Sequence, residues 1–253
     1  MNNFNLHKYS LDLSHLKNKD DKWGMYGTFM SHFDEGQKKE IKDKMGLDAN
    51  HVGIKQFEYP ESLETVQENL ALYYIKPFIE KNTNIKVPYA STPISLSSLF
   101  LNKMVAVQKI NGVTLTELNN QYAFDKLFVC NHVVNTLKRI GITWKDGHGS
   151  NIMVSNKTVE KLRQSSIRES DDGNRQYTVP LDNIEIVVIL LKDIHIVDFG
   201  RMYCKSGTEP YERLTRLEKK FQELKKQIPP DKLYLITRIC AAIQETRDDP
   251  IAF

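Results

Sequence analysis

Two short polar turns, each joined to an apolar run, constrain the fold of this 253-residue chain more than any other feature. In the first, KDGHGS (145–150) leads into the apolar run NIMV; in the second, the run IHIV leads into DFG (198–200). Short runs rich in β-branched residues predict strands, and glycines predict tight turns. The chain is therefore expected to hold two loops beside strands, with Asp146 and Asn151 on one and Asp198 on the other.

The side chains on these loops suit phosphoryl transfer. That reaction needs a divalent ion to neutralise and orient the phosphates, a cation on the phosphates, and a carboxylate to orient or deprotonate the attacking hydroxyl. With a loop between two strands, Asp146 can point at the substrate while Asn151 turns inward to a metal ion held by Asp198.

The sequence DGHGSNIMV, followed by IHIVDFG, resembles the catalytic loop and the Asp-Phe-Gly motif of the protein-kinase-like superfamily. It is particularly similar to the Asp-Arg-His-x-x-Asn-Ile-Met-Val and His-Ile-Asp-Phe-Gly motifs of phosphoinositide kinases and related atypical kinases. The resemblance implies a two-lobed α+β fold, with a small β-rich N-lobe and a reduced helical C-lobe, that binds ATP with Mg²⁺ or Mn²⁺ between the lobes. It implies that Asp146 is the catalytic carboxylate and His148 a phosphate-side contact. Asn151 and Asp198 would be the metal ligands.

A lysine upstream is expected to contact the phosphates. Lys55 lies in the strand-like run VGIKQF, points opposite to Ile54, and precedes an amphipathic helix; it resembles the third-strand lysine of kinases. Glu68 in that helix is the expected ion-pair partner, and Glu64, one turn earlier, is the competing choice.

Two further segments are assigned by the resemblance. The run KMVAVQKI (103–110) resembles the fifth strand and hinge, so backbone groups from Gln108 to Ile110 are expected to contact the adenine ring. The segment WGMYGTF offers Gly24 and Gly27 as a loop that covers the phosphates, although the separation from Gly27 to Lys55 is long for the family.

The chain departs from the family pattern in three places. Trp144-Lys145-Asp146 replaces the usual His-Arg-Asp, so the bracing histidine is missing and control by activation-loop phosphorylation is not expected. The polar segment near 154–185 looks like an insertion. No Ala-Pro-Glu follows Gly200, so the helical lobe is expected to be cut down, as in some compact bacterial effector kinases. The predicted division is an N-lobe over 1–112 and a C-lobe over 113–253.

The remaining elements follow from hydrophobic periodicity and from turn residues. Helices are expected near Glu35 to Met45, from Pro60 through Tyr74, from Thr116 to a stop at Gly141, from Glu209 to Gln227, and after Pro229-Pro230. Strands are expected at 51–59, 103–110, in NIMV, over IEIVVILL (184–191) and in IHIV.

Composition narrows the choice of partners. The formal net charge of +3 is too small for a nucleic-acid partner, which would need a concentrated basic field.

The sequence shows neither a signal peptide nor an apolar run of membrane length, so a soluble, cytoplasmic protein is expected. Its Lys- and Asn-rich composition suggests an effector delivered into a host cell. Cys130, Cys204 and Cys240 are widely spaced, which predicts reduced, buried thiols.

The charged helix at 209–227 leaves two interpretations open. Arg213, Arg216 and Lys220 fall on one side of it, which is typical of a solvated amphipathic face; the alternative is a site for a polyanion such as an inositol phosphate or an anionic membrane. The first functional expectation is an atypical protein serine/threonine kinase. A phosphoinositide or inositol-phosphate kinase is the alternative, and a pseudokinase or scaffold that binds a partner is a third.

Overall fold

The computed structural model describes residues 22–24, 27–30, 32–45, 48–57, 63–88, 104–169 and 176–247. This part of the chain is a mixed α+β fold of helices and small antiparallel sheets, which confirms the predicted class. It separates into two compact units. The first takes its residues from 1–78, 88–109 and 199–253, and the second from 79–87 and 110–198.

The first unit contains an antiparallel sheet with the order β1-β2-β3-β4. Met30 pairs with Ile54, and both side chains are fully buried, while Lys55, the next residue, turns to the other face. The strands expected at 51–59 and 103–110 are confirmed, as is the helix α1, Glu35–Met45. The strands are β1 Lys22–Gly24, β2 Gly27–Met30, β3 Val52–Phe57 and β4 Met104–Gln108.

A continuous helical run follows β3 and contains a π-helical segment. Helix α2, Leu63–Leu70, continues into η3, Ala71–Ile75, and α3, Lys76–Asn82. Val66, Leu70 and Tyr74 are buried, which confirms the predicted apolar stripe. A π turn holds one more residue than an α turn, so the buried face passes from Leu70 to both Tyr74 and Ile75.

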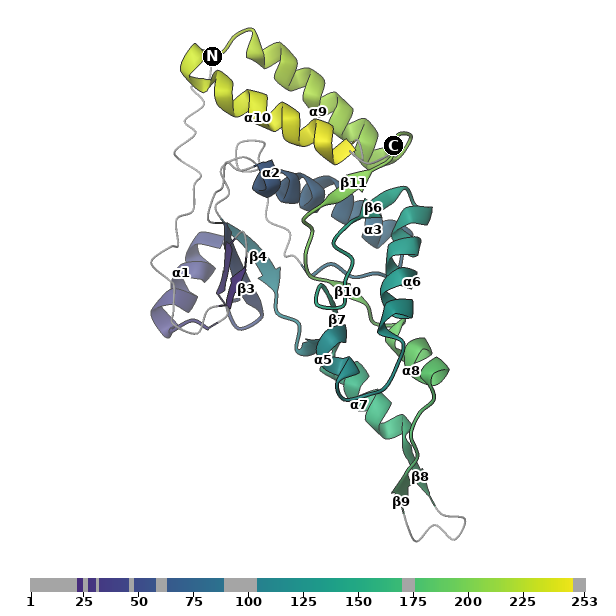
Figure 1. Cartoon of the computed structure of the whole chain (residues 1–253). Coiled ribbons are helices and arrows are strands. Elements are labelled where there is room, and N and C mark those ends of the chain that lie inside the picture. The colour runs from purple at the N-terminus through teal and green to yellow at the C-terminus, as the bar shows by residue number, and fades with distance from the viewer. Residues whose placement is uncertain are drawn as a thin grey trace. The chain divides into compact units, whose positions relative to one another are not determined.

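The C-terminal helices group with the first unit and not with the second, so the units do not follow the division expected after residue 112. Helices α9, Glu209–Lys225, and α10, Pro230–Arg247, lie side by side (Figure 1), and Arg247 Nη2 lies 2.6 Å from Glu218 Oε2. Helix α10 packs on α2, where Gln67 Nε2 donates to Glu245 Oε2 at 2.8 Å. Strand β11, Met202–Cys204, packs against α10.

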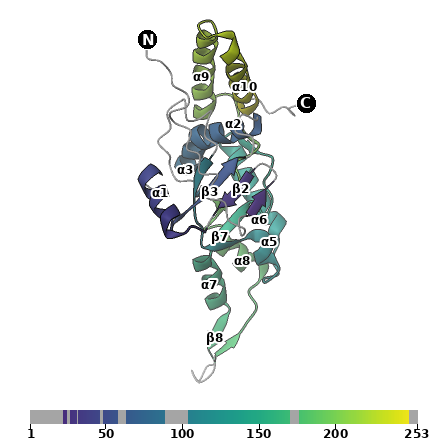
Figure 2. The ribbon, with the colours of Figure 1, turned by 90° about the vertical axis from the view of Figure 1, so that its left-hand side faces the viewer.

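The second unit is organised around an antiparallel sheet with the order β10-β7-β5. The middle strand buries Ile152 and Val154 completely. A hairpin of β8 and β9 extends beyond α7 in both views (Figures 1 and 2). The elements are β5 Gly112–Thr114, α5 Leu115–Asn119, α6 Lys126–Arg139, β6 Ile142–Trp144, β7 Ile152–Ser155, α7 Asn156–Ser165, β8 Ile167–Glu169, β9 Gln176–Thr178, α8 Asn183–Leu190 and β10 His195–Ile196.

The strand expected over IEIVVILL is wrong, because Asn183–Leu190 is the helix α8. Asp182 begins it with a capping box: its side chain accepts from Glu185 N at 2.7 Å, and Glu185 Oε2 accepts from Asp182 N at 3.1 Å. Ile186, Val187 and Leu190 are buried at helical spacing, whereas Ile184 and Val188 are exposed. The cap therefore decides the structure of a run whose apolar content alone favours a strand.

The helix expected from Thr116 is two helices, α5 and α6, and the stop at Gly141 is confirmed. Gly141 has a φ of 78°, the left-handed conformation in which glycine commonly ends a helix. Near the start of α6, the apolar residues Leu127 and Phe128 are exposed. The buried residues of α6 are Val129, Cys130, Val133 and Leu137.

Other expectations concern exposure. The segment 154–185, which was expected to be an insertion, contains buried residues, among them Thr158, Leu162 and Ser166. The three cysteines are buried and free, as predicted. No helix within the described ranges is both long and apolar enough to cross a membrane.

Candidate active site

The loop from Lys145 to Asn151 joins β6 to β7 and needs both of its glycines. A Cβ on Gly147 would lie 2.5 Å from Val134 Cγ2 on α6, and one on Gly149 would lie 2.9 Å from Thr116 Oγ1 on α5. Neither distance can accommodate a methyl group without movement of the neighbour. The DGHGS segment is therefore packed closely against two helices, which fixes the path of the backbone between Asp146 and Asn151.

The side chains of this loop are held by one another. Asn151 Nδ2 donates to the carbonyl oxygen of Asp146 at 3.0 Å and lies 3.3 Å from Asp146 Oδ2 and 3.2 Å from His148 Nε2. A carbonyl oxygen can only accept a hydrogen bond, so the atom that Asn151 turns toward Asp146 is its nitrogen. The amide oxygen Oδ1 consequently faces away from Asp146. His148 Nε2 also lies 3.7 Å from Asp146 Oδ1.

Asp198 is the second residue after the end of β10, and the residue before it, Val197, is hydrogen-bonded to Asn151. Ile196 pairs with Ile152 in the antiparallel ladder, and Val197 N donates to Asn151 O at 3.0 Å. Asp198 therefore directly follows Val197, the residue that is hydrogen-bonded to Asn151. Asp198 is half-buried. The two loops singled out in the sequence thus lie at the same end of the β7–β10 strand pair.

The donor atoms at this end are of the kind that Mg²⁺ prefers. Asn151 offers an amide oxygen and Asp198 a carboxylate, and Mg²⁺ in nucleotide sites commonly takes one or two protein ligands together with phosphate oxygens. Among the residues that the structure describes, no three His, Cys, Asp or Glu side chains gather as a metal site of their own.

Lys55 and Glu68 form an ion pair in the first unit. Lys55 Nζ donates to Glu68 Oε1 at 2.6 Å and to Oε2 at 2.8 Å, from the middle of β3 to the inner face of α2. The side chains are only 20% and 6% exposed. Glu64, the competing choice, is exposed, so Glu68 is the glutamate that pairs with Lys55.

The residues of the expected hinge and of the expected glycine loop make backbone contacts within the chain. The N–H of Gln108 donates to the carbonyl of Pro88, and that of Lys109 donates to His51 O at 2.8 Å, so these two donors are engaged within the first unit. Ile110, grouped with the second unit, is half-buried. Gly24 and Gly27 pair with each other at the ends of β1 and β2, where they flank the turn of a hairpin.

The basic residues of α9 do not form one uniform face. Arg213 lies over the rings of Tyr73 and Tyr74, with its Cζ 5.9 and 5.1 Å from their centroids, and its Nη1 is 3.8 Å from Glu209 Oε1. Burial raises the pKa of Tyr74 and nearby Tyr73 adds to this, while Arg213 opposes it. Arg216 and Lys220 are exposed, but so are Glu209, Glu212 and Glu223 on the same helix. The charge along α9 is therefore mixed.

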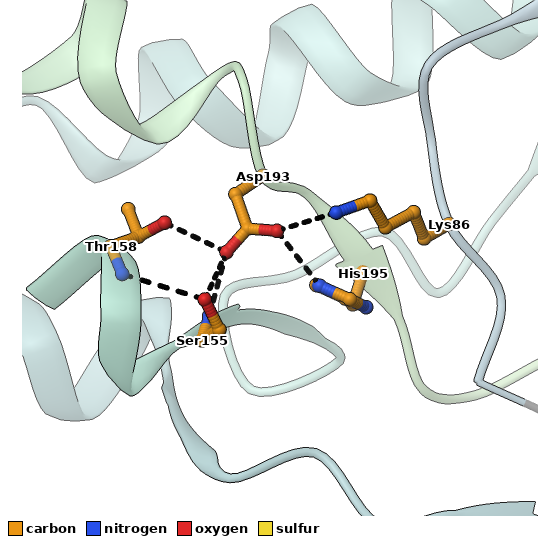
Figure 3. Close-up of polar contacts among 5 residues, drawn as sticks. All are labelled: Lys86, Ser155, Thr158, Asp193 and His195. Atoms are coloured by element: carbon orange, nitrogen blue, oxygen red, sulfur yellow. Dashed lines mark hydrogen bonds and ion pairs between the residues drawn. The ribbon is translucent and has the colours of Figure 1, made fainter.

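A cluster around Asp193 was not predicted from the sequence, and it lies at the other end of the β7–β10 pair (Figure 3). One carboxylate oxygen, Oδ1, is 2.8 Å from Lys86 Nζ and 3.0 Å from His195 Nε2. The other, Oδ2, accepts from Ser155 N at 3.0 Å, Ser155 Oγ at 2.5 Å and Thr158 Oγ1 at 2.8 Å. Its partners come from three separate stretches of sequence, and no local pattern marks them.

These contacts set the charges of the cluster. Burial alone would raise the pKa of Asp193, but hydrogen bonds from Lys86, Ser155 and Thr158 outweigh it and hold that pKa well below its ordinary value. Burial lowers the pKa of His195, although the bond to Asp193 opposes this. A negatively charged Asp193 only accepts, so Nε2 of a neutral His195 must carry the proton between them.

Comparisons of the chain with models of protein families, with curated proteins and with solved structures gave no match. The roles of the residues above consequently rest on the chain's own sequence and geometry.

Proposed function

We propose that the chain is an ATP-dependent phosphotransferase whose acceptor is a protein hydroxyl group. The observation that carries the proposal is the hydrogen bond from Val197 N to Asn151 O, at 3.0 Å, which joins the Asp146–Asn151 loop to the segment that leads into Asp198. The carboxylate proposed for the acceptor and the two oxygen ligands proposed for a divalent ion are therefore side chains of neighbouring backbone segments.

Each residue has a distinct role in this proposal. Mg²⁺–ATP, when bound, supplies the transferable phosphoryl group and the positive charge that neutralises the phosphates. Asp146 orients the acceptor hydroxyl and accepts its proton. Its side chain is half-exposed, so an acceptor can reach it. Asn151 Oδ1 and the Asp198 carboxylate hold the ion. His148, exposed beside Asp146, contacts the phosphate side.

The proposal assigns the cation on the phosphates to Lys55. Lys55 Nζ donates to both carboxylate oxygens of Glu68. In the proposal this pairing holds the lysine in place, and its ammonium group supplies the cation that the phosphates require. Replacement of Lys55 should therefore abolish transfer.

Transfer from γ-labelled ATP tests the proposal. The wild-type chain, Asp198→Ala and Lys55→Met are incubated with Mg²⁺ and with a mixture of model proteins or with phosphoinositide vesicles in separate reactions. We expect label on protein with the wild-type chain and a loss of at least about a thousandfold in both variants, since removal of charge stabilisation from a phosphoryl-transfer site has effects of that order.

Asp182→Asn is the matched control, because it also removes one carboxylate from the second unit while asparagine caps a helix as well as aspartate does. It should retain wild-type transfer. Label on lipid alone would replace the protein acceptor by a phosphoinositide. Nucleotide binding without transfer to either acceptor would refute the enzyme and favour a pseudokinase.

A further inference from the structure

The strand pair that carries the two proposed metal ligands is short. Strand β10 has two residues, His195 and Ile196, and these lie opposite Met153 and Ile152. A slip of one residue would move one strand along the other by about 3.3 Å and would turn every side chain to the opposite face. A pair this short has few ladder hydrogen bonds with which to resist such a slip.

Asp193 and Ser155 close the pair at the end away from the ligands. The register of the ladder, continued outward, places Asp193 opposite Ser155 and Val197 opposite Asn151. Asp193 Oδ2 accepts from both the backbone N and the Oγ of Ser155 (Figure 3). These two bonds form only in this register, because a slip of about 3.3 Å would carry the carboxylate out of hydrogen-bonding range.

The other edge of β10 is fixed by the same carboxylate. Lys86 N donates to Ile194 O at 2.9 Å and Ile196 N donates to Lys86 O at 3.0 Å, so the backbone of Lys86 lies along β10. The Lys86 side chain then reaches Asp193 Oδ1 at 2.8 Å. His195 Nε2 lies 3.0 Å from the same oxygen. One side chain therefore contacts the chain segments on both sides of β10.

We propose that Asp193 is the positioning residue of the metal site: by fixing the register of β10 against β7 and Lys86, it sets Asp198 beside Asn151. The inference rests on the proposed function for the identity of the ligand, but not for the register itself. Asp193 does not contact the ion; it acts through the strand pair, over four residues from Ser155 to Asn151 and five from Asp193 to Asp198, or about 13 to 17 Å.

The test compares Asp193→Asn with the wild-type chain in two measurements. The first is hydrogen exchange of the Val197 amide in the ligand-free protein, which reports the bond to Asn151 without reference to any activity. The second is the binding of Mn²⁺, followed by its electron paramagnetic resonance, in the presence of a non-hydrolysable ATP analogue. We expect faster exchange at Val197 and a loss of Mn²⁺ affinity of about tenfold or more, the range seen when partners of metal ligands are removed.

Two further variants separate positioning from general stability. Glu218→Gln breaks the ion pair with Arg247 in the first unit, whose side chains are 14% and 11% exposed, and should lower the melting temperature while leaving Val197 exchange and Mn²⁺ affinity unchanged. Lys86→Gln removes the ion pair between Lys86 and Asp193. The Lys86 side chain is 56% exposed, so this variant should fold even where Asp193→Asn does not. A smaller loss of affinity, about twofold to threefold, is expected from it.

The outcomes are distinct. Unchanged Mn²⁺ affinity and unchanged Val197 exchange in Asp193→Asn and Lys86→Gln, beside a wild-type chain that binds Mn²⁺ with the nucleotide, would overturn the positioning role alone. A wild-type chain that binds no Mn²⁺ with the nucleotide would overturn the proposed function. Equal losses of affinity in Glu218→Gln would show that Asp193 matters only for stability, and would also overturn the inference.

Discussion

The ion pair between Lys55 and Glu68 should contribute measurably to stability because it is largely removed from water. Exposed ion pairs contribute about 0–1 kcal/mol, whereas removal of one partner of a fully buried pair costs about 3–5 kcal/mol. Glu68 is 6% exposed and Lys55 20%, so the pair lies nearer the buried limit, with some hydration of the lysine. We expect a coupling energy of about 2 kcal/mol.

A double-mutant cycle isolates the coupling energy between Lys55 and Glu68. Lys55→Met and Glu68→Leu each leave one charge without its partner, and the double variant replaces both charges by apolar groups. Each single variant should be destabilised by about 2 kcal/mol, and the double variant also by only about 2 kcal/mol, which is about 2 kcal/mol less than the sum of the two single effects. Urea unfolding followed by tryptophan fluorescence and by circular dichroism gives the free energies, and the melting temperature of each single variant should fall by about 4–8 °C.

The pair formed by Lys38 and Glu35 provides an exposed control with the same shortest N–O distance. Its N–O distance is also 2.6 Å, but Glu35 is 89% exposed and Lys38 33%. A cycle on this pair should give a coupling energy below about 0.5 kcal/mol. Equal coupling energies in the two cycles, or additive effects of Lys55→Met and Glu68→Leu, would refute the buried ion pair on which the role of Lys55 depends.

Three further predictions concern the second unit. Gly147→Ala should destabilise the chain by about 1–3 kcal/mol, since its Cβ would lie 2.5 Å from Val134 Cγ2, and Val134→Ala in the same chain should restore the melting temperature. Asp182→Ala should cost about 1 kcal/mol through loss of the α8 cap, and Asp182→Asn should cost much less in the same urea titration. The stability lost in Asp193→Asn should be greatest above the ordinary carboxyl pKa of about 4 and should shrink as the pH falls below it. The pKa of Asp193 is lowered in the folded chain, so the charged carboxylate stabilises the fold fully where the unfolded chain is also ionised. This contribution is lost as the pH falls from the unfolded pKa toward the folded one. A loss that grows on acidification would contradict that assignment.

Local sequence was sufficient for the elements that carry Lys55 and Glu68. The alternation in β3 and the apolar stripe in α2 are both short-range patterns, and few residues separate the two elements in sequence, so the strand, the helix and the two candidate glutamates could be predicted. The glutamate itself could be selected only by burial, because Glu64 and Glu68 both lie in α2 and the sequence does not show how the helix is rotated.

Other features could not be predicted because they depend on residues far apart in the sequence. The run in α8 contains the β-branched residues typical of a strand, and the capping box at Asp182 decides the outcome. Asp193 reads as an ordinary turn residue beside a strand, while its partners Lys86, Ser155 and Thr158 come from elsewhere in the chain. Leu127 and Phe128 satisfy an apolar pattern that the packing of α6 leaves exposed.

The packing of α10 against α2 has a consequence for synthesis on the ribosome. Gln67 and Glu245, which bond at 2.8 Å, are 178 residues apart in sequence. The helix that carries Glu68 is therefore translated well before α10, and its partner becomes available only when α10 has been synthesised. Contacts of such long sequence separation slow folding. The first unit should consequently be completed only after α10 has emerged from the ribosome, and a nascent chain that stops before residue 230 should expose the part of α2 that α10 covers.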